Sequence, residues 1–189
     1  KEVEKYEGEG ESVTYLAKNG KLLGFFAASD TIKHDAKKTV ENLKALGIKK
    51  VIMLSGDNER VANSVAAKIG ITDVHANLLP EDKLNRLREL HKHYKVAMVG
   101  DGVNDAAALT LSHVGIAMGA LGSDSAIESA EIVLMHDNLS AIPRTIKLAR
   151  DVHTISIEDF GIWVATNGVG LFLVFGGYIG PSGAAAYNF

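Results

Sequence analysis

Short runs of consecutive apolar residues, separated by segments with helical periodicity, dominate the middle of this sequence. The runs lie at residues 51–54, 96–99, 114–118 and 132–134. Between the first two runs, Val61, Val65 and Ile69 recur at helical spacing, and Gly70 follows as a stop signal. A strand that is apolar throughout must be covered on both faces. The pattern therefore predicts an α/β fold, with a Rossmann-like parallel sheet between layers of helices.

Further elements are predicted on both sides of this central part. Strands at residues 12–17 and 22–28 are expected to form a hairpin, because Asn19 and Gly20 between them are typical of a tight turn. A long helix is expected from Ser140 onward. The remaining periodic segments predict a short strand at residues 74–76 and helices at residues 36–46, 58–69, 80–94, 104–111 and 123–129.

The segment at residues 161–180 contains no charged side chain. As a helix it would extend about 30 Å, which is the thickness of a bilayer core. Trp163 and Tyr178 stand near its two ends, where aromatic residues face the membrane interfaces. We therefore predict a transmembrane helix, with a buried helix of a soluble domain as the alternative. Asn167 lies inside the segment and is a candidate residue of an ion path.

The bulk composition narrows the classes of function. A net charge of −3 argues against nucleic acid as the main partner, because phosphate backbones attract basic surfaces. The absence of cysteine excludes disulfides and thiolate metal sites in this segment, and it agrees with a reducing compartment. Residues 1–12 are charged, contain no apolar run and do not resemble a signal peptide. We expect the chain to be a fragment or a part of a longer protein.

Two of the predicted loops carry groups that suit a phosphoryl ligand. Ser55, Gly56 and Asp57 follow an apolar strand and precede a helix, so a hydroxyl and backbone amides can meet an anion there. A simple capped turn is the alternative. Lys83 lies in the first turn of the helix that Pro80 opens, where a cation is unfavourable unless an anion binds nearby. An exposed surface lysine is the alternative.

A third loop follows the apolar run at residues 96–99. Asp101 and Asp105 bracket Gly102 and Asn104, and Gly100 precedes them, in the segment GDGVND at residues 100–105. Magnesium prefers such hard oxygen ligands, usually one or two carboxylates completed by water and phosphate. The three loops together supply a hydroxyl, amides, a lysine and acidic metal ligands. This set of groups is typical of phosphoryl transfer, where positioning and charge neutralisation dominate catalysis.

These loops resemble a known family. Residues 55–57, 80–83 and 100–105 are similar to the second, third and fourth motifs of the haloacid dehalogenase superfamily, and residues 98–106, 114–119 and 123–135 resemble its heavy-metal-transporting P-type ATPases. The resemblance implies that Asp101 is the principal Mg²⁺ ligand, supported by Asp105 and Asn104. It also implies that Ser55, Gly56, Lys83 and Asn104 hold the phosphoryl group, and that Lys83 and Asp101 are catalytic.

The same resemblance implies a division of the chain. Asp57 would lie near the nucleotide side of the site, where ATP binds, and Asp30 and Lys33 would belong to a hinge between two domains. The expected parts are the last strands of a nucleotide-binding domain (1–29), the phosphorylation domain (30–140), a connecting helix (141–160), a transmembrane helix (161–180) and the start of the next membrane segment (181–189).

One family motif is missing from this sequence. The phosphorylated nucleophile of the family is an Asp in a DKTGT segment, and the chain contains no such segment. Asp30 is the only internal candidate, but Ile32 stands where the family has Thr or Asp. The resemblance places the true nucleophile, and the central strand that carries it, upstream of this chain. We therefore expect that the chain alone does not phosphorylate itself from ATP.

The resemblance further implies an ATP-driven pump that is an integral membrane protein, with this domain on the cytoplasmic side. Its partners would be the missing nucleophile strand, nucleotide-binding domain, actuator domain and other membrane helices, together with the transported cation. The segment at residues 101–135 favours the zinc, cadmium, cobalt or manganese branches. His91 and His93 do not share a helix face, so we do not expect them to bind metal. A soluble phosphatase of the same superfamily and a non-catalytic regulatory module are the alternatives.

Overall fold

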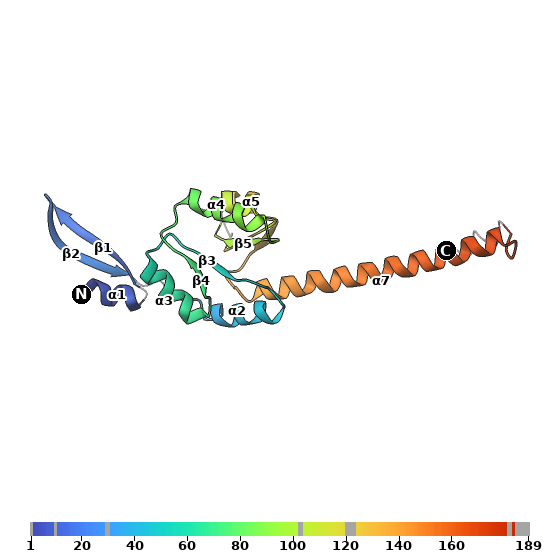
Figure 1. The fold of residues 1–189 in the computed structure, drawn as a ribbon, viewed down its shortest axis with the longest axis horizontal. Helices are drawn as coiled ribbons and strands as arrows, with labels where there is room; N and C mark the ends of the chain where they lie inside the picture. The colour runs from blue at the N-terminus through green and yellow to red at the C-terminus, as the bar shows by residue number, and fades with distance from the viewer. Residues whose placement is uncertain are drawn as a thin grey trace. The chain divides into compact units, whose positions relative to one another are not determined.

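The structure, a computed structural model, describes residues 2–9, 11–28, 31–101, 104–119, 124–180 and 183. The chain forms two compact units, residues 1–143 and 144–189. The elements before the last helix, most of which are labelled in Figure 1, are α1 (Glu2–Glu9), β1 (Ser12–Lys18), β2 (Lys21–Ala28), α2 (Ala36–Ala45), β3 (Ile52–Leu54), α3 (Glu59–Ile69), β4 (Asp73–His75), α4 (Pro80–His91), β5 (Ala97–Gly100), α5 (Ala106–Leu111), β6 (Val114–Met118), α6 (Asp124–Ser129) and β7 (Ile132–Leu134).

The strands of the first unit after the hairpin are parallel, which confirms the predicted α/β fold. β3 pairs with β4, and Leu54 lies opposite His75 at the end of that ladder. β5, β6 and β7 form a second parallel sheet, in which Gly100 lies opposite Ala117. Among the described residues no ladder joins β3 to β5. The chain therefore presents two short parallel sheets rather than one continuous sheet.

The N-terminal hairpin forms as predicted. β1 and β2 are antiparallel, and Asn19 and Gly20 between them have φ angles of 51° and 75°. Helix α1 in front of the hairpin was not predicted, because its charged residues show no apolar stripe. It contacts the hairpin through the rings of Tyr6 and Phe25, whose centroids lie 5.7 Å apart. It also contacts α3, where Arg60 Nη1 donates to Glu7 Oε2 at 3.2 Å.

Helix α3 begins at a side-chain cap. Asn58 Oδ1 accepts a hydrogen bond from Val61 N at 3.0 Å, and Asn58 Nδ2 donates to Glu7 Oε1 at 3.1 Å. We expect Asn58→Ala to lower the free energy of unfolding by about 1 kcal/mol, because it removes an N-cap. Urea denaturation followed by circular dichroism measures this loss. Asn58→Ser retains the cap without the contact to Glu7, so a loss as large as that of Asn58→Ala would contradict the capping role.

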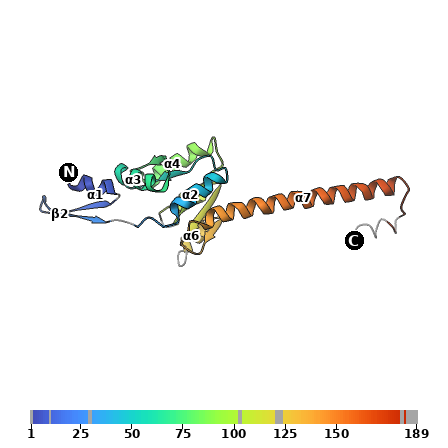
Figure 2. The same cartoon turned by 90° about the horizontal axis from the view of Figure 1, so that it is seen from below.

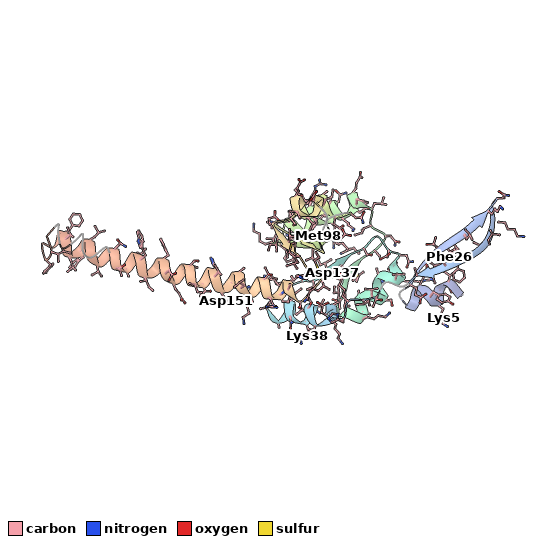
Figure 3. The ribbon with its side chains drawn as sticks, turned by 180° about the vertical axis from the view of Figure 1, so that it is seen from behind. Lys5, Phe26, Lys38, Met98, Asp137 and Asp151 are labelled. Atoms are coloured by element: carbon pink, nitrogen blue, oxygen red, sulfur yellow. The ribbon has the colours of Figure 1, made fainter. Side chains whose placement is uncertain are left out.

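A buried hydrophobic core of the first unit joins the helices and strands that surround β5. Its buried members come from four elements and are Leu87 of α4, Met98 of β5, Ala108 and Leu109 of α5, and Ala117 of β6. Met98 is labelled in Figure 3, and Leu109 and Ala117 have no exposed surface. Each fully buried large aliphatic side chain contributes roughly 1.5–3 kcal/mol. This core therefore holds α4, which carries Lys83, against β5, which directly precedes Asp101.

Helix α7 (Ala141–Phe175) is one continuous helix, as both Figure 1 and Figure 2 show. It is long and apolar enough to cross a membrane, and 6% of its apolar window is buried, unlike a core helix of a soluble protein. The helix was predicted to reach Gly180 but ends at Phe175. Gly177, with φ of 73°, ends it, and Tyr178 turns back so that its ring stacks 6.2 Å from that of Phe172.

Candidate phosphoryl-transfer site

The loops after β3 and β4 are tied together by their backbones. Ser55 N donates to His75 O at 2.9 Å, and Leu78 N donates to Ser55 O at 3.0 Å. Asn77, which has a positive φ of 55°, donates its N–H to Asp57 O at 2.8 Å. Backbone hydrogen bonds thus join the segment that leads into α4 to the candidate phosphate loop. The first and second predicted loops are neighbours in the structure.

The hydroxyl of Ser55 is engaged within its own loop. It accepts a hydrogen bond from Asp57 N at 3.1 Å and donates to Asp57 Oδ2 at 2.9 Å. Asn58, rather than Ser55 or Asp57, caps the following helix. A Cβ at Gly56 would lie 3.5 Å from Leu78 O, an ordinary contact, so crowding does not require glycine there. A phosphoryl oxygen would have to replace Asp57 as the acceptor for the Ser55 hydroxyl.

Lys83 joins the second predicted loop to the third. Its helix begins at Pro80, and Asp82 Oδ2 accepts from Leu79 N at 3.0 Å. Lys83 Nζ lies 2.7 Å from Asp105 Oδ1, and each of the two side chains is only 15% exposed. The sequence predicted an anion beside Lys83, and the structure places the Asp105 carboxylate there. Limited exposure strengthens this ion pair relative to one at the surface.

Gly100 makes room for Asp105. A Cβ at Gly100 would lie 2.9 Å from Asp105 Cβ and 3.0 Å from Asp105 Oδ2, closer than side-chain carbons approach in proteins. We expect Gly100→Ala to displace Asp105 from Lys83 and to lower the free energy of unfolding by about 1–3 kcal/mol, as overpacking does. Urea denaturation tests this. Gly24→Ala is the matched control, because no atom lies within 4 Å of a Cβ there, and an equal loss in both variants would contradict the steric argument.

Asp101 directly follows β5, and Asp105 directly precedes α5. Asn104 N donates to Asp101 Oδ1 at 3.3 Å, and Asp101 faces solvent. Gly102 and Val103 between them lie outside the described residues. The described part of the chain holds no group of three or more His, Cys, Asp or Glu side chains arranged for a metal. Magnesium takes one or two carboxylates with water and phosphate, so the donors present fit that ion.

Other predicted residues lie elsewhere. Lys33 forms an ion pair with Asp137, a partner that the sequence did not indicate. Asp30 lies outside the described residues. Asn167 Nδ2 donates to Trp163 O at 2.8 Å within α7, so its amide group is bonded to its own helix. No local sequence pattern predicts long-range partners such as Asp137.

The two histidines near the end of α4 diverge, as expected. The ring of His91 lies 4.3 Å from that of His113, whereas His93 meets the edge of Tyr94 at 6.4 Å. Burial, followed by the nearby charges of His91 and Lys95, lowers the pKa of His113.

Comparison with known proteins covers most of the chain. The family model for haloacid dehalogenase-like hydrolases matches residues 1–112. A probable cadmium-transporting ATPase of Alkalihalophilus pseudofirmus is 40% identical over 174 residues, which are 92% of this chain and 24% of that protein. A manganese-exporting P-type ATPase of Mycobacterium leprae is 37% identical over 187 residues, which are 98% of this chain and 26% of that protein. The chain spans about a quarter of the length of these relatives.

Solved structures agree with these relatives. A zinc-transporting PIB-type ATPase in the E2.Pi state superposes with a TM-score of 0.83 and 37% identity, covering 98% of this chain and 30% of that chain. The catalytic domain of a CPx-ATPase gives a TM-score of 0.56 and 35% identity over 68% of this chain and 51% of that chain. The chain therefore belongs to the haloacid dehalogenase-like hydrolase family, and its relatives within that family are heavy-metal-transporting P-type ATPases.

Proposed function

We propose that this chain is the phosphorylation-domain part of an ATP-driven pump for a heavy-metal cation. The observation that carries the proposal is the Lys83–Asp105 ion pair, together with Asp101, which directly follows β5 at the carboxyl end of a parallel ladder. Ligands bind at such strand ends in open α/β sheets. The relatives described above are named as cadmium-transporting, manganese-exporting and zinc-transporting ATPases, and they support the same assignment.

The acidic residues of the third loop are assigned to magnesium. Asp101 and Asp105 would hold Mg²⁺, and Asn104 would support Asp101 through the hydrogen bond between them. When bound, Mg²⁺ supplies positive charge that neutralises phosphoryl oxygens. The Asp105 carboxylate already pairs with the ammonium of Lys83. Metal binding would share this carboxylate between the two cations and make the ammonium of Lys83 available to a phosphoryl oxygen. The ion pair thus positions the Lys83 ammonium for the incoming phosphoryl group.

The first loop is assigned to the phosphoryl group and the nucleotide. Ser55 and the amide of Gly56 would bind phosphoryl oxygens, and Asp57 would lie on the side of ATP. The Ser55 hydroxyl donates to Asp57 Oδ2, and the same proton can be redirected to a phosphoryl oxygen. In that exchange the Asp57 carboxylate would lose its hydrogen bond from Ser55. Phosphoryl binding would thereby affect the nucleotide side of the site, where Asp57 lies.

The rest of the pump would supply what this chain does not contain. We assign the nucleophilic aspartate to an upstream strand that completes the sheet between β3 and β5. Residues 1–29 would end the nucleotide-binding domain, with Lys33 at the hinge, and residues 30–140 would form the phosphorylation domain. Helix α7 would connect this domain on the cytoplasmic side to the membrane. The cadmium, manganese and zinc relatives favour a divalent heavy-metal cation as the cargo.

Phosphoenzyme formation tests this proposal. We expect no acid-stable phosphoenzyme when the 189-residue chain is incubated with radiolabelled ATP and Mg²⁺. Coexpression with the upstream portion of the pump should restore a Mg²⁺-dependent, hydroxylamine-sensitive product. A phosphoenzyme on the chain alone would contradict the assigned position of the nucleophile. Hydrolysis of small phosphate esters by the chain alone would support a soluble phosphatase instead.

A further inference from the structure

The side chain of His75, at the end of β4, lies between two groups of opposite charge. Arg86 Nη2 of α4 is 2.9 Å from His75 Nε2, and Asp73 Oδ1 of β4 is 3.1 Å from the same nitrogen. Both contacts are within hydrogen-bond distance, and both depend on one ring atom. The His75 side chain is 27% exposed, so solvent protons can reach it.

One ring nitrogen cannot serve both neighbours. A guanidinium carries only donors and stays protonated, so a bond from Arg86 requires that Nε2 be unprotonated and accept. A carboxylate only accepts, so a bond to Asp73 requires a proton on Nε2. The contact with Arg86 therefore belongs to a neutral ring that carries its proton on Nδ1. The contact with Asp73 becomes a hydrogen bond when Nε2 is protonated.

We propose that His75 is a positioning residue whose protonation exchanges Arg86 for Asp73 and so changes how α4 is held against β4. In the neutral state, Arg86 donates to the ring and ties the helix to the strand. The imidazolium repels the guanidinium and donates to Asp73 instead. Within the described residues, Arg86 Nε is buried without a hydrogen-bond partner, so the loss of His75 leaves the guanidinium poorly satisfied.

The other charged groups around His75 have partners of their own. His75 lines two pockets, of which one also includes Glu59 of α3 and the other includes Asp82, Arg88 and Glu89 of α4. Asp82 accepts from Leu79 N, Arg88 donates to Asn85, and Glu89 pairs with Lys92. Glu59 lies in the first turn of α3, where a carboxylate is favourable. Direct competition at Nε2 is therefore between Arg86 and Asp73.

The exchange is connected to the candidate site at two points. The backbone oxygen of His75 accepts from Ser55 N at 2.9 Å. Arg86 stands three residues after Lys83, so the two side chains project from neighbouring positions on α4. Release of Arg86 loosens the helix that presents Lys83. The consequence for phosphoryl binding rests on the proposed function, whereas the exchange itself does not.

Nitrogen-15 NMR of the full chain in detergent micelles tests the exchange directly. At about pH 8, where histidine is neutral, we expect the His75 ring to carry its proton on Nδ1 and Nε2 to show the shift of an acceptor. On acidification, the Arg86 side-chain signals should move together with those of His75. His75→Gln should leave the Arg86 side-chain signals unchanged on acidification. A proton on Nε2 at about pH 8, or Arg86 signals that ignore the titration of His75, would overturn the proposal.

Binding of orthovanadate, a phosphate analogue, to the full-length pump tests the link to the site. Between about pH 8 and pH 5.5, wild type should lose roughly tenfold more affinity than His75→Gln, which is the worth of one hydrogen bond to a charged group. Glutamine can accept from Arg86 at every pH. His153→Gln, at an exposed position of α7, should behave as wild type. Equal pH profiles in wild type and His75→Gln would overturn the link. Failure of all variants to bind orthovanadate would count against the proposed function, and NMR would still decide the exchange.

Discussion

Asp101→Asn in the full-length pump is expected to reduce ATP hydrolysis by roughly 10²- to 10³-fold, the loss typical when one preorganised electrostatic group is removed from a catalytic site. The substitution keeps the shape of the side chain, and its amide oxygen can still accept from Asn104 N, a bond of 3.3 Å in the structure. The charge alone is lost. Steady-state hydrolysis as a function of Mg²⁺ concentration measures the effect, and more Mg²⁺ should be required for any residual activity.

A purely structural role for Asp101 predicts a different result. In that case the thermal stability of the chain would fall in Asp101→Asn, whereas the metal-ligand assignment predicts unchanged stability without Mg²⁺ and a smaller rise when Mg²⁺ is added. Asp151→Asn is the matched control, because Asp151, labelled in Figure 3, is exposed on α7 and belongs to the second compact unit. Asp101→Asn with at least half of the wild-type activity would exclude Asp101 as the principal magnesium ligand.

The elements of this fold could be predicted because their causes are local. Asn19 and Gly20 adopt positive φ angles that a tight hairpin requires, and Gly70, with φ of 81°, ends α3 as its type indicates. Apolar runs became strands for a similar reason. Helix α1 was missed because its contacts are distant: Glu7 meets Asn58 and Arg60, more than fifty residues away. Periodicity within a segment contains no information about such partners.

The candidate site shows the same division. Loop chemistry predicted that Lys83, Asp101 and Asp105 would gather at strand ends, and the structure brings Lys83 and Asp105 together. It could not predict that Lys83 would meet a carboxylate of the chain itself, since that depends on how α4 packs against α5. The competition at His75 was likewise invisible, because Asp73 and Arg86 reach it from different elements. Residue types indicated the chemistry, and tertiary packing decided the pairs.

Lys83→Met is expected to lower the free energy of unfolding by about 3 kcal/mol, because removal of one partner leaves the other charge poorly solvated. Asp105, its partner at 2.7 Å, is only 15% exposed, so water replaces the ammonium poorly. Methionine retains most of the apolar stem, which separates the loss of charge from the loss of packing. Hydrogen exchange of the core amides of Leu109 and Ala117, measured across a urea series, reports the change in unfolding free energy of the first compact unit.

The same helix provides a matched control. Lys92 also lies 2.7 Å from a carboxylate, that of Glu89, but these side chains are 61% and 60% exposed. The hydrogen bond from Lys92, and then its charge, lower the pKa of Glu89, yet exposed pairs of this kind contribute little to stability. Lys92→Met should therefore leave the unfolding free energy nearly unchanged. Equal losses in the two variants would show that burial does not set the strength of the Lys83–Asp105 pair.

The double variant Lys83→Met/Asp105→Asn separates the two explanations that remain. If the uncompensated carboxylate causes the loss, neutralising Asp105 should recover much of the stability, because no buried charge is left without a partner. If Lys83 stabilises the protein only through packing, the losses in unfolding free energy caused by Lys83→Met and by Asp105→Asn should add. Mg²⁺ extends the test: as a second cation for Asp105, it should stabilise Lys83→Met more than wild type, and it should stabilise the double variant, which retains only Asp101, less than Lys83→Met. Additive losses that Mg²⁺ does not change would contradict the joint assignment of Asp105 to lysine and metal.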